Sequence, residues 1–377
     1  MTRIGIIGGG QLARMMALAG WHMGVEFSFL ASEGESTRCV AGLGKVVVLS
    51  PGQSPQQLYA ALGEPDVITV ERERVDLELL RGFTQLCAVH PNPDAVEACG
   101  DRFKEKQLLD SVRLPSAPYR IAESALQVAE DARTLGLPVV VKNPTEGYDG
   151  KQQWHLYDEA QLRAFIAENP PGQWLVESRI QFEREVSMVA ARSANGDIAI
   201  YPPTENRHHN GILLSSVAPA AEMPASLMAD CEAYIRTLLA AMDYVGVAAM
   251  ECFVTAEGLL INELAPRVHN SGHWTMLGEA TSQFENHLRA ILGMTLGTTS
   301  TARFHGMVNI LGEYDREQAL GGLSTNAALH DYNKTPAPLR KRGHINVAAD
   351  SRAAVESELA RIQQMLYPQG EPDPKSG

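Results

Sequence analysis

A stretch near the middle of the chain, GVAAMECFVTAEGLLINELAPRVHNSGHW at residues 246–274, gathers side chains that could do chemistry. Two carboxylates, Glu251 and Glu263, occupy its strand-like parts, and an arginine, two histidines and two asparagines accompany them. Carboxylate oxygens at close range suit Mg²⁺, which binds through a few carboxylates and completes its shell with phosphate oxygens and water. Cationic groups beside such a metal suit an anionic substrate that faces a phosphate. We therefore interpret the stretch as a candidate site for metal-assisted phosphate chemistry.

The pattern of this stretch predicts a β-hairpin, because alternating residues precede position 255 and an apolar run follows it. If the connection is a three-residue loop with Gly258 in the left-handed conformation, Thr255 pairs with Leu259. Counting back along both strands then places Glu251 opposite Glu263. Opposed side chains lie roughly 4.5–5.5 Å apart at Cβ, where two like charges repel, so we expect a cation between them. The alternative is a pair of solvated glutamates on an open face of the sheet.

The segment NELAPRVHNSGHW, which begins at Asn262, resembles the magnesium-binding segment of the ATP-grasp superfamily and, within it, the N5-carboxyaminoimidazole ribonucleotide synthases. The resemblance implies a mixed α/β (α+β) fold in three domains. These are a Rossmann-like pre-grasp domain at residues 1–100, an ATP-grasp domain at 101–296, and a small C-terminal domain at 297–377, for which the sequence predicts strands and one helix before a disordered tail. It also implies ATP and Mg²⁺ as cofactors, with Glu251 and Glu263 as the metal ligands.

The reaction implied by the resemblance is a step of purine biosynthesis that consumes ATP and bicarbonate. 5-Aminoimidazole ribonucleotide is carboxylated through carboxyphosphate to N5-carboxyaminoimidazole ribonucleotide, and ADP and phosphate are released. Arg267, His269 and Asn270 are expected to position the intermediate and its acceptor. The family typically forms homodimers. Two other functions stay open: another ATP-grasp ligase, such as the formate-dependent glycinamide ribonucleotide transformylase, and a nicotinamide-dependent oxidoreductase.

The resemblance assigns nucleotide contacts to several further segments. In the helix DRFKEKQ, Arg102 is expected to reach the phosphates, and Lys106 is a weaker candidate. Lys142 ends an apolar strand, a costly place for an ammonium group unless it meets an anion. The segment after Trp174 resembles the hinge that holds adenine, although ordinary surface glutamates would explain its acids equally well. The expected nucleotide-binding residues are Arg102, Lys142, Gly147, Tyr148, Asp149, Gly150, Lys151, Gln152, Gln153, Glu177, Ser178, Arg179, Ile180, Glu185, His208, Asn262 and Glu263.

The loop EGYDGKQ at residues 146–152 contains two glycines, which let backbone N–H groups approach a phosphate and allow the loop to close. It resembles the family's GYDGKG loop, except that Gln152 stands where the last glycine is expected. By this resemblance Tyr148, Asp149 and Lys151 are catalytic residues that cover the substrate and bicarbonate during turnover.

A basic stretch near the C-terminus, YNKTPAPLRKRGHINV, contains the remaining candidate substrate residues. A solvated turn is the simplest interpretation of such charges. In the family, the corresponding residues reach the 5′-phosphate of the ribotide, so Lys334 and Arg340 are expected to bind it alongside Arg267, His269 and Asn270. APLRK lacks the first arginine and the glycine of the family's RPGRK sequence.

The N-terminal residues predict a parallel α/β layer. Strands are expected at 3–7, 25–31, 45–49, 66–70 and 86–89, with helices after the glycine turn at 8–10 and near 54–62. Gly8-x-Gly10-x-x-Ala13 formally matches the dinucleotide fingerprint and is the basis of the nicotinamide alternative. The other interpretation is a glycine turn that only packs a helix on a strand.

Composition bounds the remaining possibilities. The 377 residues carry a formal net charge of -13, which argues against nonspecific binding of nucleic acid or acidic lipid. The five cysteines show no CxxC spacing, so neither a disulfide framework nor a zinc site is indicated. The sequence has no apolar run of about eighteen residues and no leader-like segment. We expect a cytoplasmic protein that does not enter a membrane.

Overall fold

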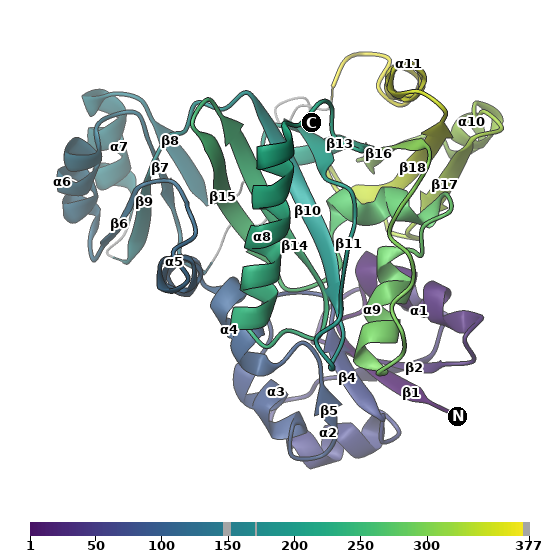
Figure 1. Ribbon diagram of the computed structural model, residues 1–377. Helices are drawn as coiled ribbons and strands as arrows, with labels where there is room; N and C mark the ends of the chain where they lie inside the picture. Colours follow the sequence, from purple (N-terminus) through teal and green to yellow (C-terminus); the bar gives the residue numbers. More distant parts are fainter. Residues whose placement is uncertain (146–151, 170–171, 372–377) are drawn as a thin grey trace.

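The computed structural model describes residues 1–145, 152–169 and 172–371, which form three β-sheets with helices packed against them (Figure 1). The N-terminal sheet is parallel, with strand order β3-β2-β1-β4-β5, as the sequence predicts. Its inner strands β1, β2 and β4 are short, almost fully buried apolar runs, whereas the edge strand β3 is mostly exposed. The elements are β1 (Arg3–Ile7), α1 (Gln11–Trp21), β2 (Glu26–Ala31), η1 (Arg38–Val40), β3 (Lys45–Val48), α2 (Pro55–Ala61), β4 (Val67–Val70), α3 (Leu77–Phe83), β5 (Ala88–Val89) and α4 (Pro93–Gly100).

A small antiparallel sheet follows and forms the lobe at the left of Figure 1. Its strand order is β6-β9-β7-β8, and three aromatic rings, Trp154, Phe165 and Trp174, pack edge to face beneath it with centroids 5.1–5.4 Å apart. Helix α5 (Arg102–Ser111) leads into the lobe and begins at Asp101, whose side chain accepts from the Phe103 amide at 2.8 Å. The other elements are β6 (Tyr119–Ala122), α6 (Ala125–Leu135), β7 (Val139–Lys142), β8 (Gln153–Leu156), α7 (Glu159–Glu168) and β9 (Trp174–Ser178).

The largest sheet has nine strands in the order β15-β14-β10-β12-β13-β16-β18-β17, with β11 paired to β10. It crosses the expected domain boundary near residue 296, because β13 pairs directly with β16. Its elements are β10 (Arg184–Arg192), β11 (Ile198–Ile200), β12 (Thr204–His209), β13 (Ile212–Ala218), α8 (Ala225–Ala241), β14 (Gly246–Thr255), β15 (Gly258–Ala265), η3 (Asn270–Met276), α9 (Gln283–Ile291), β16 (Phe304–Leu311), α10 (Arg316–Gly321), β17 (Ala327–Asp331), β18 (Lys341–Ala349) and α11 (Arg352–Leu366). The exact domain bounds at residues 100 and 296 stay a prediction.

The C-terminal part departs from expectation in two respects. The sequence predicts one helix there, whereas α10 and α11 are both present, since Asp315 and Ser351 each cap a helix start. It also predicts a disordered tail after Tyr367. Residues 368–371 belong to the described chain, and Glu371 forms an ion pair with Nδ1 of His209 at 2.7 Å, whereas residues 372–377, where the rest of this prediction falls, lie outside the described residues.

The β14–β15 hairpin confirms the predicted pairing of Glu251 with Glu263, but the predicted turn was wrong. The turn has two residues, so Thr255 pairs with Gly258 and not with Leu259. The register then shifts by one residue next to Glu251, where Asn262 is left out of the pairing as a β-bulge. The shorter turn and the bulge each move the register by one residue in opposite directions, which is why the two glutamates still face each other.

The N-terminal sheet and the large sheet share one apolar core, to which α1, η3 and α9 contribute. His287 of α9 links the two sheets directly. Its Nε2 lies 2.8 Å from the Thr69 hydroxyl of β4, and its Nδ1 accepts from the Val247 amide of β14 at 3.0 Å. Burial lowers the pKa of His287 to about 3, so the link is made by a neutral imidazole. None of the described helices is both long enough and apolar enough to span a membrane.

Candidate active site

A cavity of about 340 Å³ opens where the small lobe meets the large sheet, between β7 and β9 on one side and β10, β12, β14 and β15 on the other. Residues from widely separated segments of the sequence converge on it. Fifteen of the expected site residues line this one cavity: Arg102, Lys142, Gln153, Glu177, Ser178, Arg179, Ile180, Glu185, His208, Glu251, Asn262, Glu263, Arg267, His269 and Asn270.

Carboxylates from three neighbouring strands meet in this cavity. Glu185 lies on β10, Glu251 on β14 and Glu263 on β15, and β14 pairs with both of the other strands. Burial raises the pKa of Glu251 to about 7, and the negative charges of Glu263 and Glu185 add to the effect, while His208 opposes it. The charge of His208 therefore does not offset the combined effect of burial and the neighbouring carboxylates on Glu251.

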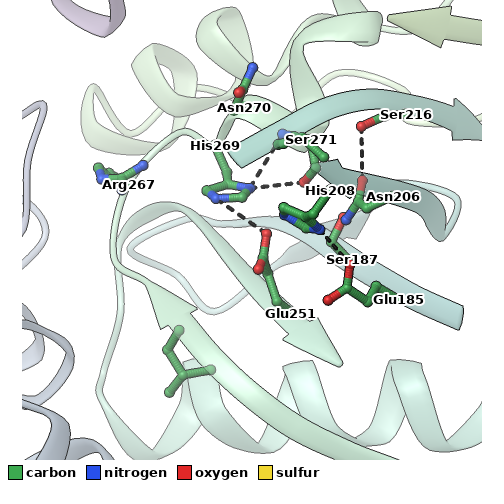
Figure 2. A network of polar contacts seen from close by, with 12 residues as sticks. Glu185, Ser187, Asn206, His208, Ser216, Glu251, Arg267, His269, Asn270 and Ser271 are labelled. Carbon is green, nitrogen blue, oxygen red and sulfur yellow. Dashed lines mark hydrogen bonds and ion pairs between the residues drawn. The ribbon is translucent and has the colours of Figure 1, made fainter. Parts of the chain in front are cut away.

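Two histidines, His208 and His269, lie beside these carboxylates, as Figure 2 shows. Nδ1 of His208 contacts a carboxylate oxygen of Glu185. Although burial opposes a charged imidazole, Glu185 and Glu251 raise the pKa of His208. Nε2 of His269 lies 3.6 Å from Oε1 of Glu251. Burial, with Arg267 nearby, lowers the pKa of His269 well below its usual range.

The tautomer of His269 follows from its hydrogen bonds. Its Nδ1 accepts from the Ser271 amide at 3.3 Å and lies 2.9 Å from the Ser271 hydroxyl. A nitrogen that accepts carries no proton, so the neutral ring is assigned a proton on Nε2, which points toward Glu251. His269 is thus placed to donate into the cavity. Asn270, its neighbour, is buried and exchanges two hydrogen bonds with the Asn309 amide of β16, at 2.8 and 3.1 Å.

Glu177 holds two lysines at the rim of the small lobe. Its carboxylate lies 2.7 Å from Nζ of Lys106 and 2.5 Å from Nζ of Lys142. Burial alone would raise the pKa of Glu177, but the two ammonium groups outweigh it and lower the pKa to about 2. The sequence suggests Glu177 as part of an adenine-binding hinge, and its side chain instead fixes the positions of two cations. Lys106, the weaker candidate of the sequence, lies one turn after Arg102 on α5.

The carboxylate pair fits Mg²⁺ by its donor chemistry. All its ligand atoms are oxygens, burial and the nearby carboxylates raise the pKa of Glu251, and the bulge at Asn262 sets an amide beside the pair. Among the described residues, no group of three or more His, Cys, Asp or Glu side chains could hold a metal ion. Glu251 and Glu263 would therefore supply two ligands, and the other ligands must come from phosphate oxygens and water.

A second cavity, of about 840 Å³, lies between the N-terminal sheet and the C-terminal strands and shares Arg267 and Lys341 with the first. Lys334 and Arg340 line this second cavity and not the first, so the structure separates the expected substrate residues into two groups. Arg267 spans them. It is buried, and its guanidinium binds Glu73 in a two-pronged ion pair at 2.5 and 3.3 Å.

The glycine turn before α1 has no room for a dinucleotide. The buried carboxylate of Glu71 accepts from the backbone amides of Gly10 and Ala13 at the start of the helix, where a pyrophosphate would bind. At Gly8 the backbone φ is +122°, and a Cβ there would lie 2.4 Å from the same side chain. An internal acid thus occupies the anion site, and the nicotinamide alternative is not supported.

Several lining residues were missing from the expected set. Phe182 and Phe253 stack with centroids 4.6 Å apart and form an apolar wall of the first cavity. Phe253 lies two residues after Glu251 on the same face of the strand, and this spacing could have identified it as a lining residue. Phe182 is exposed on a loop, where no sequence pattern indicates that it lines the cavity. His155 and Lys341 also line the cavity.

Most of the glycine loop lies outside the described residues, including the expected Gly147, Tyr148, Asp149, Gly150 and Lys151. Gln152 is described, and it does not line the first cavity. Its φ of +53° lies in the left-handed region that favours glycine, the residue that the family sequence has there.

Three family models match successive parts of the chain. The ribonucleotide synthetase preATP-grasp domain matches residues 1–99, the ATP-grasp domain residues 107–284, and the phosphoribosylaminoimidazole carboxylase C-terminal domain residues 306–358. All three occur in the order that the sequence predicted.

Similarity to known proteins extends over nearly the whole chain. The N5-carboxyaminoimidazole ribonucleotide synthase of Vibrio cholerae is 38% identical over 371 residues, covering 97% of this chain and 95% of the relative. The crystal structure of the corresponding synthetase from Thermus thermophilus has a TM-score of 0.89 at 38% identity, covering 98% of this chain and 99% of that one. An ADP complex of such a synthetase has a TM-score of 0.89 at 35% identity, covering 98% of both chains. This chain therefore belongs to the N5-carboxyaminoimidazole ribonucleotide synthase family of ATP-grasp ligases.

Proposed function

We propose that the chain joins bicarbonate to the exocyclic amine of 5-aminoimidazole ribonucleotide at the expense of ATP, in the space where the two cavities meet. The observation that supports this proposal best is the position of Arg267 and Lys341, which line both cavities. A phosphate-bearing donor on one side and a phosphate-bearing acceptor on the other would meet at these two cations. The first cavity alone could serve a single substrate. Cations shared by two cavities are what a reaction between two phosphate-bearing substrates needs.

In this proposal ATP occupies the first cavity. The stacked rings of Phe182 and Phe253 offer an apolar wall for the base, and Lys142 and Arg102 face the phosphates. Glu177 holds Lys142 in place, so the lysine does not need to be ordered when the nucleotide arrives. When bound to Glu251 and Glu263, Mg²⁺ would neutralise charge on the phosphate oxygens.

Bond changes follow from the positions of the two substrates. A bicarbonate oxygen attacks the γ-phosphorus, the bond from that phosphorus to the bridging oxygen breaks, and ADP leaves. The product, carboxyphosphate, carries its acyl carbon to the boundary between the cavities. The ribotide amine bonds to that carbon, directly or after release of CO₂, the bond from the carbon to the phosphate oxygen breaks, and the departing phosphate takes up the proton that the amine loses. Arg267 and the Nε2–H of His269 would hold the anionic intermediate, because both side chains line the first cavity and Arg267 also lines the second.

The ribotide occupies the second cavity, with Lys334 and Arg340 facing its 5′-phosphate. Arg340 donates to the Thr335 hydroxyl at 3.2 Å, which steadies the loop before β18. Glu73 keeps Arg267 directed at the junction. Water must be excluded from this space because carboxyphosphate hydrolyses, and residues 147–151 are proposed to cover it by analogy with the family loop.

An ADP-release assay tests the proposed reaction. We expect full activity only when bicarbonate and 5-aminoimidazole ribonucleotide are both present, and ¹³C-labelled bicarbonate should deliver its carbon to the ribotide. Formate with glycinamide ribonucleotide should give no stimulation. Stimulation by that second pair, without stimulation by the first, would contradict the proposal and favour the transformylase.

The proposal includes a homodimer in a reducing, cytoplasmic setting. All five cysteines are unpaired thiols in the structure, which is usual where disulfides do not form. Light scattering on the purified chain should give twice the monomer mass of 41.0 kDa, and a single-chain mass would contradict the dimer.

A further inference from the structure

A third cavity, of about 490 Å³, opens between the N-terminal segment that contains α1 and η1 and the C-terminal strands β17 and β18. It is separate from the cavity that we assign to ATP, with which it shares no lining residue. With the ribotide cavity it shares one residue, Lys334. We call this space the basic cavity. Its charged lining residues are Arg14, Arg38, Arg316, Asp331, Lys334 and Arg342.

The basic cavity has an unusual charge balance for this molecule. Five of its lining residues are cations and one is a carboxylate, whereas the whole chain carries a net charge of -13. The carboxylate, Asp331, is already engaged. It accepts from the Tyr314 hydroxyl and from the Asn333 amide at 2.6 Å, and lies 3.8 Å from Nε of Arg316. Positive charge of this density, next to an overall acidic surface, attracts small anions.

The cations are held in place by contacts that leave donors available. Arg14 of α1 donates from one Nη to the Cys39 carbonyl at 2.8 Å. The guanidinium of Arg342 packs over the ring of Tyr314 at 5.5 Å, which orients this side chain where it lines the basic cavity. The Asn333 side chain donates to the Arg38 carbonyl at 2.9 Å and so ties the two walls together. The guanidinium groups thus converge from separate elements on a preformed space.

We propose that the basic cavity binds a small molecule with a multiply charged phosphate group, and that this ligand competes with the ribotide through Lys334. Arginine presents planar pairs of donors that match phosphate oxygens, and several such groups around one space favour more than one negative charge. A volume of about 490 Å³ is within the range of ordinary small-molecule sites and admits either pyrophosphate or a nucleotide tail.

Competition follows from the position of Lys334. Its Nζ donates to Gln11 of α1 and lies 5.9 Å from the Tyr332 ring, at the wall between the basic cavity and the ribotide cavity. One ammonium group does not neutralise two phosphates fully, so occupation of either cavity weakens binding in the other by the same factor. This coupling rests on the proposed function, whereas anion binding by the basic cavity does not.

Calorimetric titration with inorganic pyrophosphate, without divalent metal, tests the binding site. The variant Arg38→Ala/Arg316→Ala removes two exposed cations of the basic cavity, and Arg163→Ala/Arg236→Ala removes two exposed cations elsewhere as a matched control for net charge. We expect the first variant to bind pyrophosphate about tenfold more weakly than the parent, and the control to bind as the parent does. Equal binding by the two variants would overturn the site.

Steady-state kinetics test the coupling. Pyrophosphate should raise KM for the ribotide without lowering kcat, and this effect should disappear in Arg38→Ala/Arg316→Ala, which should keep the parent's kinetics when pyrophosphate is absent. Inhibition that survives in the variant would place pyrophosphate outside the basic cavity and overturn the coupling. Titration with ADP separates the two sources of the phosphate group. If Arg38→Ala/Arg316→Ala binds ADP more weakly than the parent, the basic cavity accepts the phosphates of a nucleotide. If the variant binds ADP as the parent does, the basic cavity is restricted to the inorganic anion. If the chain shows no ligase activity, the calorimetric difference still decides the binding site.

Discussion

Glu251 and Glu263 face each other across β14 and β15 because Asn262 is left out of the pairing between these strands. Without the bulge, the two-residue turn would set Glu251 opposite Asn262 and turn Glu263 toward the other face. The bulge therefore decides whether two carboxylates can share a cation. By bringing Glu251 and Glu263 together, the bulge also makes it costly to keep both side chains charged without a cation, as the raised pKa of Glu251 indicates.

Replacing one of these carboxylates tests the metal assignment. We expect Glu263→Gln to lower kcat by about 10²–10³ while the circular dichroism spectrum stays unchanged, because an amide is a much poorer ligand for Mg²⁺. Glu257→Gln, in the exposed turn of the same hairpin, is the matched control and should keep full activity. Full ADP release by Glu263→Gln would refute the assignment.

Arg267 should matter more for coupling than for nucleotide binding. In Arg267→Gln we expect ADP formation to exceed ribotide carboxylation, because the intermediate would escape to water from the junction of the two cavities. Arg179 lines the ATP cavity and not the ribotide cavity, so Arg179→Gln should raise KM for ATP and leave the ratio of the two products at one. Measuring ADP and carboxylated ribotide in the same samples checks both variants, and a ratio of one in Arg267→Gln would be inconsistent with this role.

The Glu73–Arg267 ion pair also makes a stability prediction. Arg267→Gln removes the cation beside the partly buried Glu73, and Glu73→Gln removes a carboxylate from the buried Arg267, so each should cost about 3–5 kcal/mol of unfolding free energy. The double variant should lose less than the sum of the two, since it removes both charges. Denaturant titrations of all four proteins measure the difference, and strict additivity would show that the pair is not coupled.

Glu177 should contribute strongly to stability through its two lysines. In Glu177→Gln, Lys106 and Lys142 would face each other without a counter-charge, and we expect a loss of about 3–5 kcal/mol in the free energy of unfolding. Exposed Glu183 is the comparison, and Glu183→Gln should change stability by less than about 0.5 kcal/mol. ATP should bind Glu177→Gln more weakly even where it stays folded. If Glu177→Gln and Glu183→Gln were equally stable, the ion pairs of Glu177 would not stabilise the fold.

The pH dependence of stability should contain a contribution from His287. Its pKa is about 3 in the folded chain, below the ordinary value of 6.5, so the folded state resists protonation. The stability that depends on neutral His287 is complete above pH 6.5 and is lost as the pH falls toward 3. Two pH units below the ordinary value, this loss is about 2–3 kcal/mol. Unfolding of His287→Gln should show a smaller decrease than the parent, whereas His22→Gln, at an exposed site, should follow the parent.

The sequence was sufficient for the parts of the site that repeat a local pattern. Strand alternation and the apolar run identified the hairpin, and an ammonium group at the end of an apolar strand identified Lys142. The pairing of Glu251 with Glu263 was obtained with a wrong turn, because a bulge at Asn262 has no signature that distinguishes it from a longer loop. Local pattern alone therefore did not determine the register.

Residues that act through tertiary contacts were the ones missed or misinterpreted. Glu177 was predicted to face the nucleotide and does line the first cavity, but the sequence did not show that its carboxylate also holds lysines of α5 and β7, which are distant in sequence. Glu71 directly follows β4, and only the fold brings its carboxylate to the amides of Gly10 and Ala13. Phe182 lies in a polar loop, where no periodicity indicates that it stacks on Phe253.

The continuity of the nine-stranded sheet limits how the chain can be divided. A fragment that stops before β16 would leave β13, whose seven residues are all buried in the intact chain, with unpaired backbone groups along one side. An apolar strand exposed in this way recruits strands from other molecules. A shortened chain that keeps most of the ATP cavity would accordingly form insoluble assemblies instead of a working nucleotide-binding fragment.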